Sequence, residues 1–235
     1  MDDRFFPFFA RYEAILQQAD DAFAKVAAEY PDCVKCQIGC SDCCYALFDL
    51  TLIEALYINH QFLTQLPPGQ QETLREKANR ADRQSYKIKR DAYKRMESGE
   101  PEADILSRIA QERIRCPLLN NDDQCDLYKY RPATCRFYGI PTSIHGRGHT
   151  CGLSGFSEGV AYPTVKLDLI QNALIRISED LLAAIGSRYV KMTEMLVPLS
   201  MAIITDYNDV YLGLPGARDD ASEPGPKSAT RDGGR

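Results

Sequence analysis

The sequence lacks long apolar runs, tryptophan and an excess of positive charge. No uninterrupted apolar stretch approaches the 18 or more residues of a membrane-spanning helix, so an integral membrane protein is not expected. The chain has no Trp and only 3 His, which leaves few side chains for stacking on bases or for histidine-based metal sites. Its 28 Lys and Arg against 33 Asp and Glu give a net charge of −5. A nucleic-acid partner is not expected either, because phosphate binding requires a concentrated positive surface.

Cysteine is too rare for a small secreted disulfide scaffold, and its distribution is uneven. The 9 Cys in 235 residues are about 4 %, below the 8–10 % typical of that class. The N-terminal MDDRFFPFF has no basic segment followed by a small-residue cleavage site, so we expect a cytoplasmic, reducing location. Clustered cysteines in such a compartment are typically metal ligands or catalytic thiols. The two groups are Cys33, Cys36, Cys40, Cys43 and Cys44, and then Cys116, Cys125, Cys135 and Cys151.

Apolar residues repeat at helical spacing along most of the chain, which predicts a mainly α fold. Thr51 followed by Glu54 forms a capping box that begins one of these helices. Pro198 interrupts the last helix, where we expect a kink. No alternation long enough to predict a sheet is visible. The predicted helices cover 12–30, 52–66, 71–97, 167–184 and 189–203.

The pattern predicts a single helical domain over residues 1–214, with a cysteine core at 33–151. Helical periodicity disappears between residues 114 and 163, where Gly, Pro, Asn and Asp accumulate. We therefore expect two cysteine-rich loops, 33–44 and 114–151, that fold together around a metal site. Residues 215–235 form a predicted flexible tail, because seven of its 21 residues are Gly or Pro and its only apolar residues are alanines.

The cysteine spacing predicts metal without selecting the metal, since thiolates suit both zinc and iron–sulfur clusters. The first group does not match the bacterial ferredoxin run, which has a different spacing and a proline after its last cysteine. Two zinc sites of four thiolates each and one [4Fe–4S] cluster with further thiols both remain possible. Cys43 and Cys44 are adjacent in the sequence, so we expect their side chains to diverge and to bind different metal atoms.

The combined motif resembles one known family. The chain reads Cys36-Gln-Ile-Gly-Cys40-Ser-Asp-Cys43-Cys44, then Cys116-Pro, then Cys125, then Arg131-Pro-Ala-Thr-Cys135 and Cys151, which is similar to the YkgJ or CxxCxxCC family of zinc- or iron-chelating, iron–sulfur-cluster-containing domains. Cys33 precedes the matched pattern. The resemblance implies an iron–sulfur cluster, [4Fe–4S] in type, with Zn²⁺ as the alternative. It implies eight ligands, which are Cys36, Cys40, Cys43, Cys44, Cys116, Cys125, Cys135 and Cys151.

Other residues bear on the same site, although the sequence assigns no catalytic residue. Arg131 and Arg136 flank Cys135 and can offset the negative charge of thiolates or form ordinary salt bridges. His149, two residues before Cys151, is a candidate ligand or proton donor. The helix at 71–97 is rich in Arg and Lys but interleaved with acidic residues, which favours a self-paired, solvated face over a protein-binding surface. Three functions fit: an iron–sulfur protein in redox or modification chemistry, a zinc-stabilised interaction module and a thiol-based metal carrier.

Overall fold

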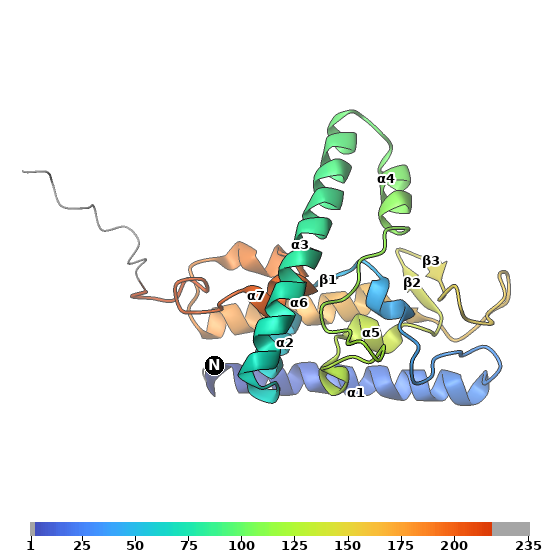
Figure 1. The fold of residues 1–235 in the computed structure, drawn as a ribbon, viewed down its shortest axis with the longest axis horizontal. Helices are drawn as coiled ribbons and strands as arrows, with labels where there is room; N and C mark the ends of the chain where they lie inside the picture. The colour runs from blue at the N-terminus through green and yellow to red at the C-terminus, as the bar shows by residue number, and fades with distance from the viewer. Residues whose placement is uncertain (1–2, 218–235) are drawn as a thin grey trace, which may run out of the picture.

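The computed structural model describes residues 3–217 and confirms a mainly helical fold (Figure 1). The predicted tail at 215–235 lies outside the described residues from 218 onward. No helix within 3–217 is both long and apolar enough to cross a membrane. The α-helices are α1 (Phe6–Glu29), α2 (Leu52–Gln65), α3 (Pro68–Glu97), α4 (Glu102–Ile109), α5 (Ala133–Phe137), α6 (Leu167–Ala184) and α7 (Leu199–Ile204).

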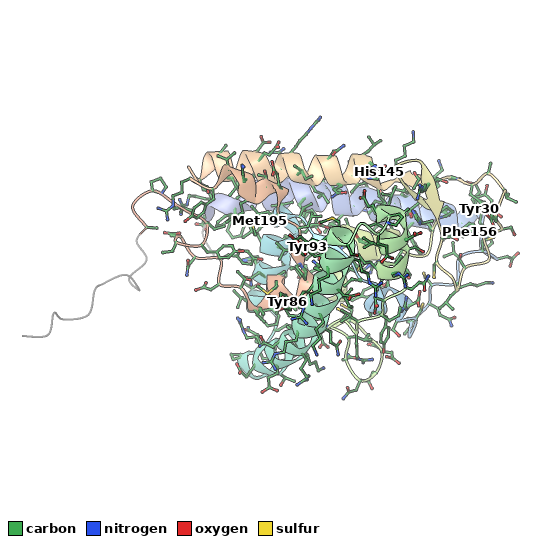
Figure 2. All side chains as sticks on the ribbon, turned by 90° about the horizontal axis from the view of Figure 1, so that it is seen from above. Tyr30, Tyr86, Tyr93, His145, Phe156 and Met195 are labelled. Atoms are coloured by element: carbon green, nitrogen blue, oxygen red, sulfur yellow. The ribbon has the colours of Figure 1, made fainter. Side chains whose placement is uncertain are left out.

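Helix α2 is the centre of the core. The capping box of Thr51 and Glu54 forms as predicted, and ten residues of α2 are buried, so the helix is covered on nearly all sides. Helices α1 and α6 run side by side and both contact α2 (Figures 1 and 2). Each contributes one apolar stripe, as the periodicity predicts. The buried stripe residues include Tyr12, Leu16, Ala19 and Val26 in α1 and Leu174, Ile177 and Leu181 in α6.

Two small sheets correct the expectation that the chain has none. Strand β1 (Asp49–Leu50) pairs antiparallel with β5 (Val197–Pro198). Strand β2 (Thr142–Ile144) pairs antiparallel with β3 (Arg147–His149) and parallel with β4 (Val165–Lys166). Strands of two or three residues leave no readable alternation in the sequence, which explains why the pattern missed them.

The predicted kinked helix at 189–203 is wrong. Residues Val190–Glu194 form a 3₁₀ helix, Val197–Pro198 pair with β1, and only Leu199–Ile204 are α-helical. Proline lacks a backbone N–H and fits the start of a helix better than its interior. Pro198 therefore precedes α7 instead of bending a longer helix.

Helices α3 and α4 form a hairpin that projects from the body of the molecule (Figure 1). The first half of α3 packs through Leu74, Ala78 and Ala81, as the thin apolar stripe predicts. Beyond Ser85 the helix is largely exposed, and Tyr86 and Tyr93 are 63 % and 55 % exposed. Helix α4 was not predicted, because its eight residues contain only one buried side chain. Glu100, between the two helices, forms ion pairs with Arg95 of α3 and Arg108 of α4.

Candidate metal centre

Backbone hydrogen bonds join the two cysteine-rich loops directly. The N–H of Cys116 donates to the carbonyl of Cys44 at 2.7 Å, and the N–H of Ile114 donates to the carbonyl of Tyr45 at 3.1 Å. A bridge between Ala46 and Arg113 extends this short antiparallel pairing. Two cysteines 72 positions apart in the sequence are therefore neighbours through the main chain, as the predicted joint folding of the loops requires.

A tight turn brings Cys125 back toward Cys116. Leu119 and Cys125 form an antiparallel bridge, and the side-chain oxygen of Asn120 accepts hydrogen bonds from the N–H groups of Asp122 and Gln124, both at 3.0 Å. Such side-chain turns are characteristic of Asn and Asp. The run Asn-Asn-Asp-Asp could have revealed this turn from the sequence.

Helix α5 carries Cys135 and is anchored by a buried arginine. The Arg136 guanidinium forms an ion pair with Asp20 of α1 and donates to the carbonyls of Lys129 at 2.6 Å and Arg131 at 3.1 Å. The Arg136 side chain is only 7 % exposed, although its bonds are partly buried, and hydrogen bonds from a charged guanidinium are strong and directional. The role of Arg136 is thus the structural one of its two predicted alternatives.

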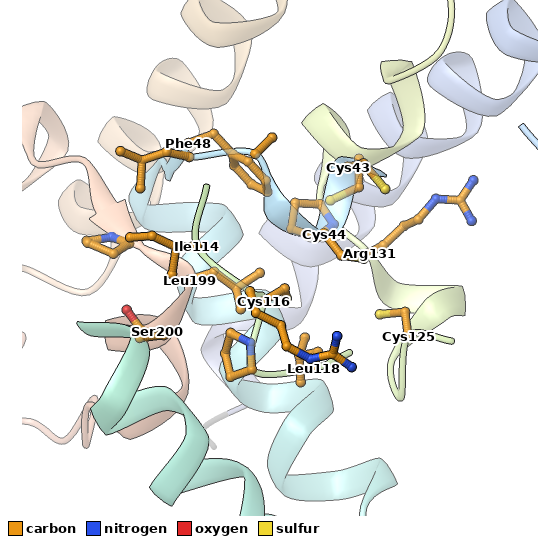
Figure 3. Close-up of a pocket in the computed structure, with 18 of the residues that line it drawn as sticks. Cys43, Cys44, Phe48, Ile114, Cys116, Leu118, Cys125, Arg131, Leu199 and Ser200 are labelled. Atoms are coloured by element: carbon orange, nitrogen blue, oxygen red, sulfur yellow. The ribbon is translucent and has the colours of Figure 1, made fainter. Parts of the chain in front are cut away.

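Five cysteines from both loops surround one cavity (Figure 3). The cavity holds about 70 Å³ of space for water-sized molecules. Figure 3 shows cysteines and Arg131 on one side, with Phe48, Leu199 and Ser200 on the other. We call the thiols that line it the inner cysteine group; they are Cys43, Cys44, Cys116, Cys125 and Cys135.

Cys43 and Cys44, whose side chains are expected to diverge, both line the cavity. The nearby thiol of Cys44, followed by burial, raises the pKa of Cys43. The 3₁₀ helix Asp42–Tyr45 curls the chain at these two residues. Whether they bind different metal atoms stays a prediction.

The remaining matched cysteines, Cys36, Cys40 and Cys151, form an outer cysteine group, since the thiols of Cys40 and Cys151 both affect the pKa of Cys36, and Asp42 lies beside its member Cys151. The thiol of Cys151 lies 3.6 Å from an Asp42 carboxylate oxygen, and the Tyr138 hydroxyl donates to the same oxygen at 2.8 Å. Arg113 forms an ion pair with Asp42. Sequence reasoning missed Asp42, since nothing in its spacing sets it apart from other acidic residues.

Glycine is required beside Cys36. Gly139 has φ of +102°, and a Cβ at this position would collide with the Cys36 sulfur. The thiol of Cys36 also lies 3.7 Å from the carbonyl of Tyr138. The chain that follows α5 therefore holds the first loop by close backbone approach.

Burial and mutual proximity raise the pKa of the thiols. Burial, followed by the nearby thiol of Cys125, raises the pKa of Cys116 to about 12. Burial, followed by the thiols of Cys40 and Cys151, raises the pKa of Cys36 to about 11. Burial also raises the pKa of Cys135, with Cys43 as the next cause. Crowded thiolates repel one another. The positive charge of a bound cation offsets this repulsion and favours the deprotonated form of each coordinating thiol.

The donor chemistry fits a metal, although the thiols are not arranged as a finished coordination shell. Within residues 3–217 no group of three or more His, Cys, Asp or Glu side chains is placed to hold one metal ion. All nine cysteines are free thiols, which is the form that zinc and iron–sulfur clusters require. The residues at the cavity would therefore have to move closer together to bind a metal.

Cys33, which precedes the matched pattern, and the candidate His149 both lie outside the inner group. Cys33 does not line the cavity, and its carbonyl accepts a hydrogen bond from the N–H of Gly155 at 2.8 Å. His149 is exposed on β3 and lines a separate cavity of about 110 Å³ together with Cys151. The structure thus places His149 beside the outer group only.

An aromatic cluster that the sequence did not predict fastens the loop after Cys151. The rings of Tyr30 and Tyr162 are 5.3 Å apart, and those of Phe156 and Tyr162 are 4.9 Å apart. Figure 2 shows Tyr30 and Phe156 together at one end of α1. This cluster holds residues 155–162 against the start of the first cysteine loop.

The comparisons with known proteins agree with the cysteine pattern. A comparison with curated proteins and one with solved structures gave no significant match. A family model, CxxCxxCC, described as "Putative zinc- or iron-chelating domain", matches residues 33–152. The match covers half of the 235 residues and includes all nine cysteines. The chain therefore belongs to the CxxCxxCC family of zinc- or iron-chelating domains.

Proposed function

We propose that this chain is an iron–sulfur protein whose inner and outer cysteine groups hold a [4Fe–4S] cluster and a further metal. One observation carries the proposal: five free thiols from loops far apart in the sequence line a single cavity. Four thiolates suffice for one cluster, so the eight matched cysteines exceed the need of a single centre. The surplus supports a second site at Cys36, Cys40 and Cys151, beside Asp42.

The neighbouring residues suit a negatively charged centre. Arg131 lines the cavity, and its guanidinium also lies 4.1 Å from the centre of the Tyr128 ring, which fixes its direction. A cationic group beside thiolates lowers the cost of gathering negative charge. The apolar wall, which includes Phe48 and Leu199, limits the access of water. When bound, an iron–sulfur cluster supplies one-electron redox chemistry.

A zinc-stabilised interaction module is the second candidate. It draws on the projecting hairpin of α3 and α4, which exposes Tyr86, Tyr93 and Met96, because exposed aromatic residues are enriched at protein interfaces. In that function the metal holds the loops together, and the hairpin contacts a protein partner. Part of the hairpin's charge is already paired, since Arg95 contacts both Asp91 and Glu100.

Metal analysis of anaerobically purified protein tests the proposal. We expect brown protein that contains iron and acid-labile sulfide, with at least four iron atoms per chain for a [4Fe–4S] cluster. Colourless protein with zinc alone would replace the first candidate by the second. Protein that binds neither metal, even after reconstitution with iron and sulfide, would contradict both.

Removal of the metal tests whether the loops share it. We expect chelation to raise hydrogen exchange in both 33–44 and 114–151, because the free energy of metal binding stabilises the loops that supply the ligands. Exchange in α2 should stay slow, since this buried helix contributes no residue to the lining of the cavity. A rise confined to 33–44 would show that the loops bind metal separately.

A further inference from the structure

The side chain of Glu54 accepts hydrogen bonds from the start of its own helix, from α5 and from α1. Glu54 is 5 % exposed. One carboxylate oxygen accepts from the N–H of Thr51 at 3.0 Å and from the Thr51 hydroxyl at 2.9 Å. The other accepts from the N–H of Ala133 at 3.3 Å and lies 3.5 Å from the Tyr12 hydroxyl. All four surrounding groups are donors, which is an environment suited to a carboxylate.

Two of these contacts lie at helix starts. Thr51 precedes α2, where the bonds to Glu54 belong to the capping box. Ala133 is the first residue of α5, and the preceding Pro132 has no side chain that can cap the helix. Glu54, 79 positions earlier in the sequence, supplies that missing acceptor. Cys135 of the inner cysteine group follows two residues later.

We propose that Glu54 is a positioning residue for the metal centre, because its carboxylate fixes the start of α5 and thereby places Cys135 toward the cavity. The inference rests on the proposed metal-binding function and extends it to a residue outside the cysteine motif. Arg136, three residues after Ala133, contacts Asp20 of α1. Polar contacts thus hold α5 to both α2 and α1.

An amide cannot replace this carboxylate. A Gln side chain has one acceptor oxygen and one NH₂ group, so it can satisfy either the N–H of Thr51 or that of Ala133. Hydroxyl groups can rotate to accept a hydrogen bond, but backbone N–H groups cannot. The two bonds to Thr51 are shorter than the bond to Ala133. We therefore expect Glu54→Gln to keep the cap of α2 and to release α5.

The test compares Glu54→Gln with Thr51→Ala in the full chain. Thr51→Ala removes the hydroxyl from the capping box but leaves the contact between Glu54 and Ala133 in place. Two measurements are made on each variant: the alkylation rate of every cysteine in metal-free protein, followed by mass spectrometry, and the affinity for Co²⁺ alone. Circular dichroism checks that both variants remain helical.

Glu54→Gln should raise the alkylation rate of Cys135 about tenfold and weaken Co²⁺ binding by a similar factor, as expected for one lost buried hydrogen bond. The alkylation of Cys36, in the outer group, should not change. Thr51→Ala should change both readouts by less than about twofold while it lowers the stability of the helix. Equal effects of the two variants would overturn the proposal, as would an unchanged Cys135 in Glu54→Gln.

The unsubstituted chain supplies an independent measurement in case Glu54→Gln does not fold. The amide of Ala133 should exchange with solvent at least about tenfold more slowly than a free amide, because Glu54 accepts its hydrogen bond. Exchange at the rate of a free amide would overturn the proposal. If the unsubstituted chain binds no Co²⁺, the metal-binding function fails, and the alkylation of Cys135 still decides the role of Glu54.

Discussion

Replacement of Arg136 by Met tests whether polar contacts, and not only apolar packing, hold α5 in place. The Met side chain has similar length and fills similar space but removes every hydrogen bond of the guanidinium. Three partners lose their donor: the carbonyls of Lys129 and Arg131 and the carboxylate of Asp20. The two carbonyls belong to the backbone, so they cannot rotate toward water as a side chain can.

The expected loss of stability follows from the exposure of these partners. A fully buried carbonyl left without a donor costs about 1–3 kcal/mol, and the cost is smaller here because the bonds to Lys129 and Arg131 are only partly buried. The Asp20 side chain is 40 % exposed, so water can solvate it, and its ion pair adds at most about 1 kcal/mol. Burial of the Met side chain offsets part of the cost. Arg136→Met should therefore lower the free energy of unfolding by about 1–4 kcal/mol.

Urea unfolding followed by circular dichroism measures this loss, with Arg11→Met as the matched control. Arg11 of α1 pairs with Asp180 of α6 at 2.8 Å, but these two side chains are 47 % and 57 % exposed. An exposed pair contributes about 0–1 kcal/mol, so the control should stay within 1 kcal/mol of the parent. A similarly small change in Arg136→Met would refute the reasoning. Both comparisons require an unchanged dependence of the free energy on urea concentration.

Three further substitutions have defined outcomes. Cys33→Ser should retain the full metal content of the parent, because Cys33 does not line the cavity; metal analysis that finds a loss would add it to the ligands. Gly139→Ala should lower the free energy of unfolding by about 1–3 kcal/mol, since it combines backbone strain with a collision against Cys36. The control Gly146→Ala has open space around the added methyl group, so it should lower the free energy of unfolding by only about 1 kcal/mol. Ser85→Ala should leave stability unchanged or raise it by up to about 1 kcal/mol, because its buried hydroxyl has no hydrogen-bond partner among the described residues; a loss above 1 kcal/mol in urea unfolding would contradict this.

Periodicity predicts the scaffold because it reports burial along one continuous helix. The stripe that begins at Tyr12 and the capping box at Thr51 are local features, and α2 starts where the box predicts, whereas α1 begins six residues before the stripe, at Phe6. The signal fails where an element is short or where tertiary contacts decide its form. Residues 189–203 carry helical spacing, yet pairing of Val197 with Leu50 takes this segment into a strand before α7.

The grouping of the cysteines could not be read from their spacing, because it depends on contacts between distant segments. The backbone hydrogen bond between Cys116 and Cys44 follows from how both loops pack on the helices, which no local pattern encodes. The same holds for Asp42, whose role depends on Tyr138 and Arg113. The family pattern supplies the eight cysteines as a set, but only the three-dimensional arrangement separates the inner cysteine group from the outer one.

The second cysteine loop is attached to the scaffold by apolar burial, through Leu118, Leu127, Phe137 and Ile140, and also by directional polar contacts. Arg136 contacts Asp20, and Glu54 contacts Ala133. Apolar contacts tolerate small shifts, but hydrogen bonds lose strength rapidly with distance and angle. The polar contacts therefore fix the start of α5 and with it the position of Cys135, whose burial opposes its ionisation in the metal-free chain. A bound metal would offset that cost, because a coordinating thiol is deprotonated.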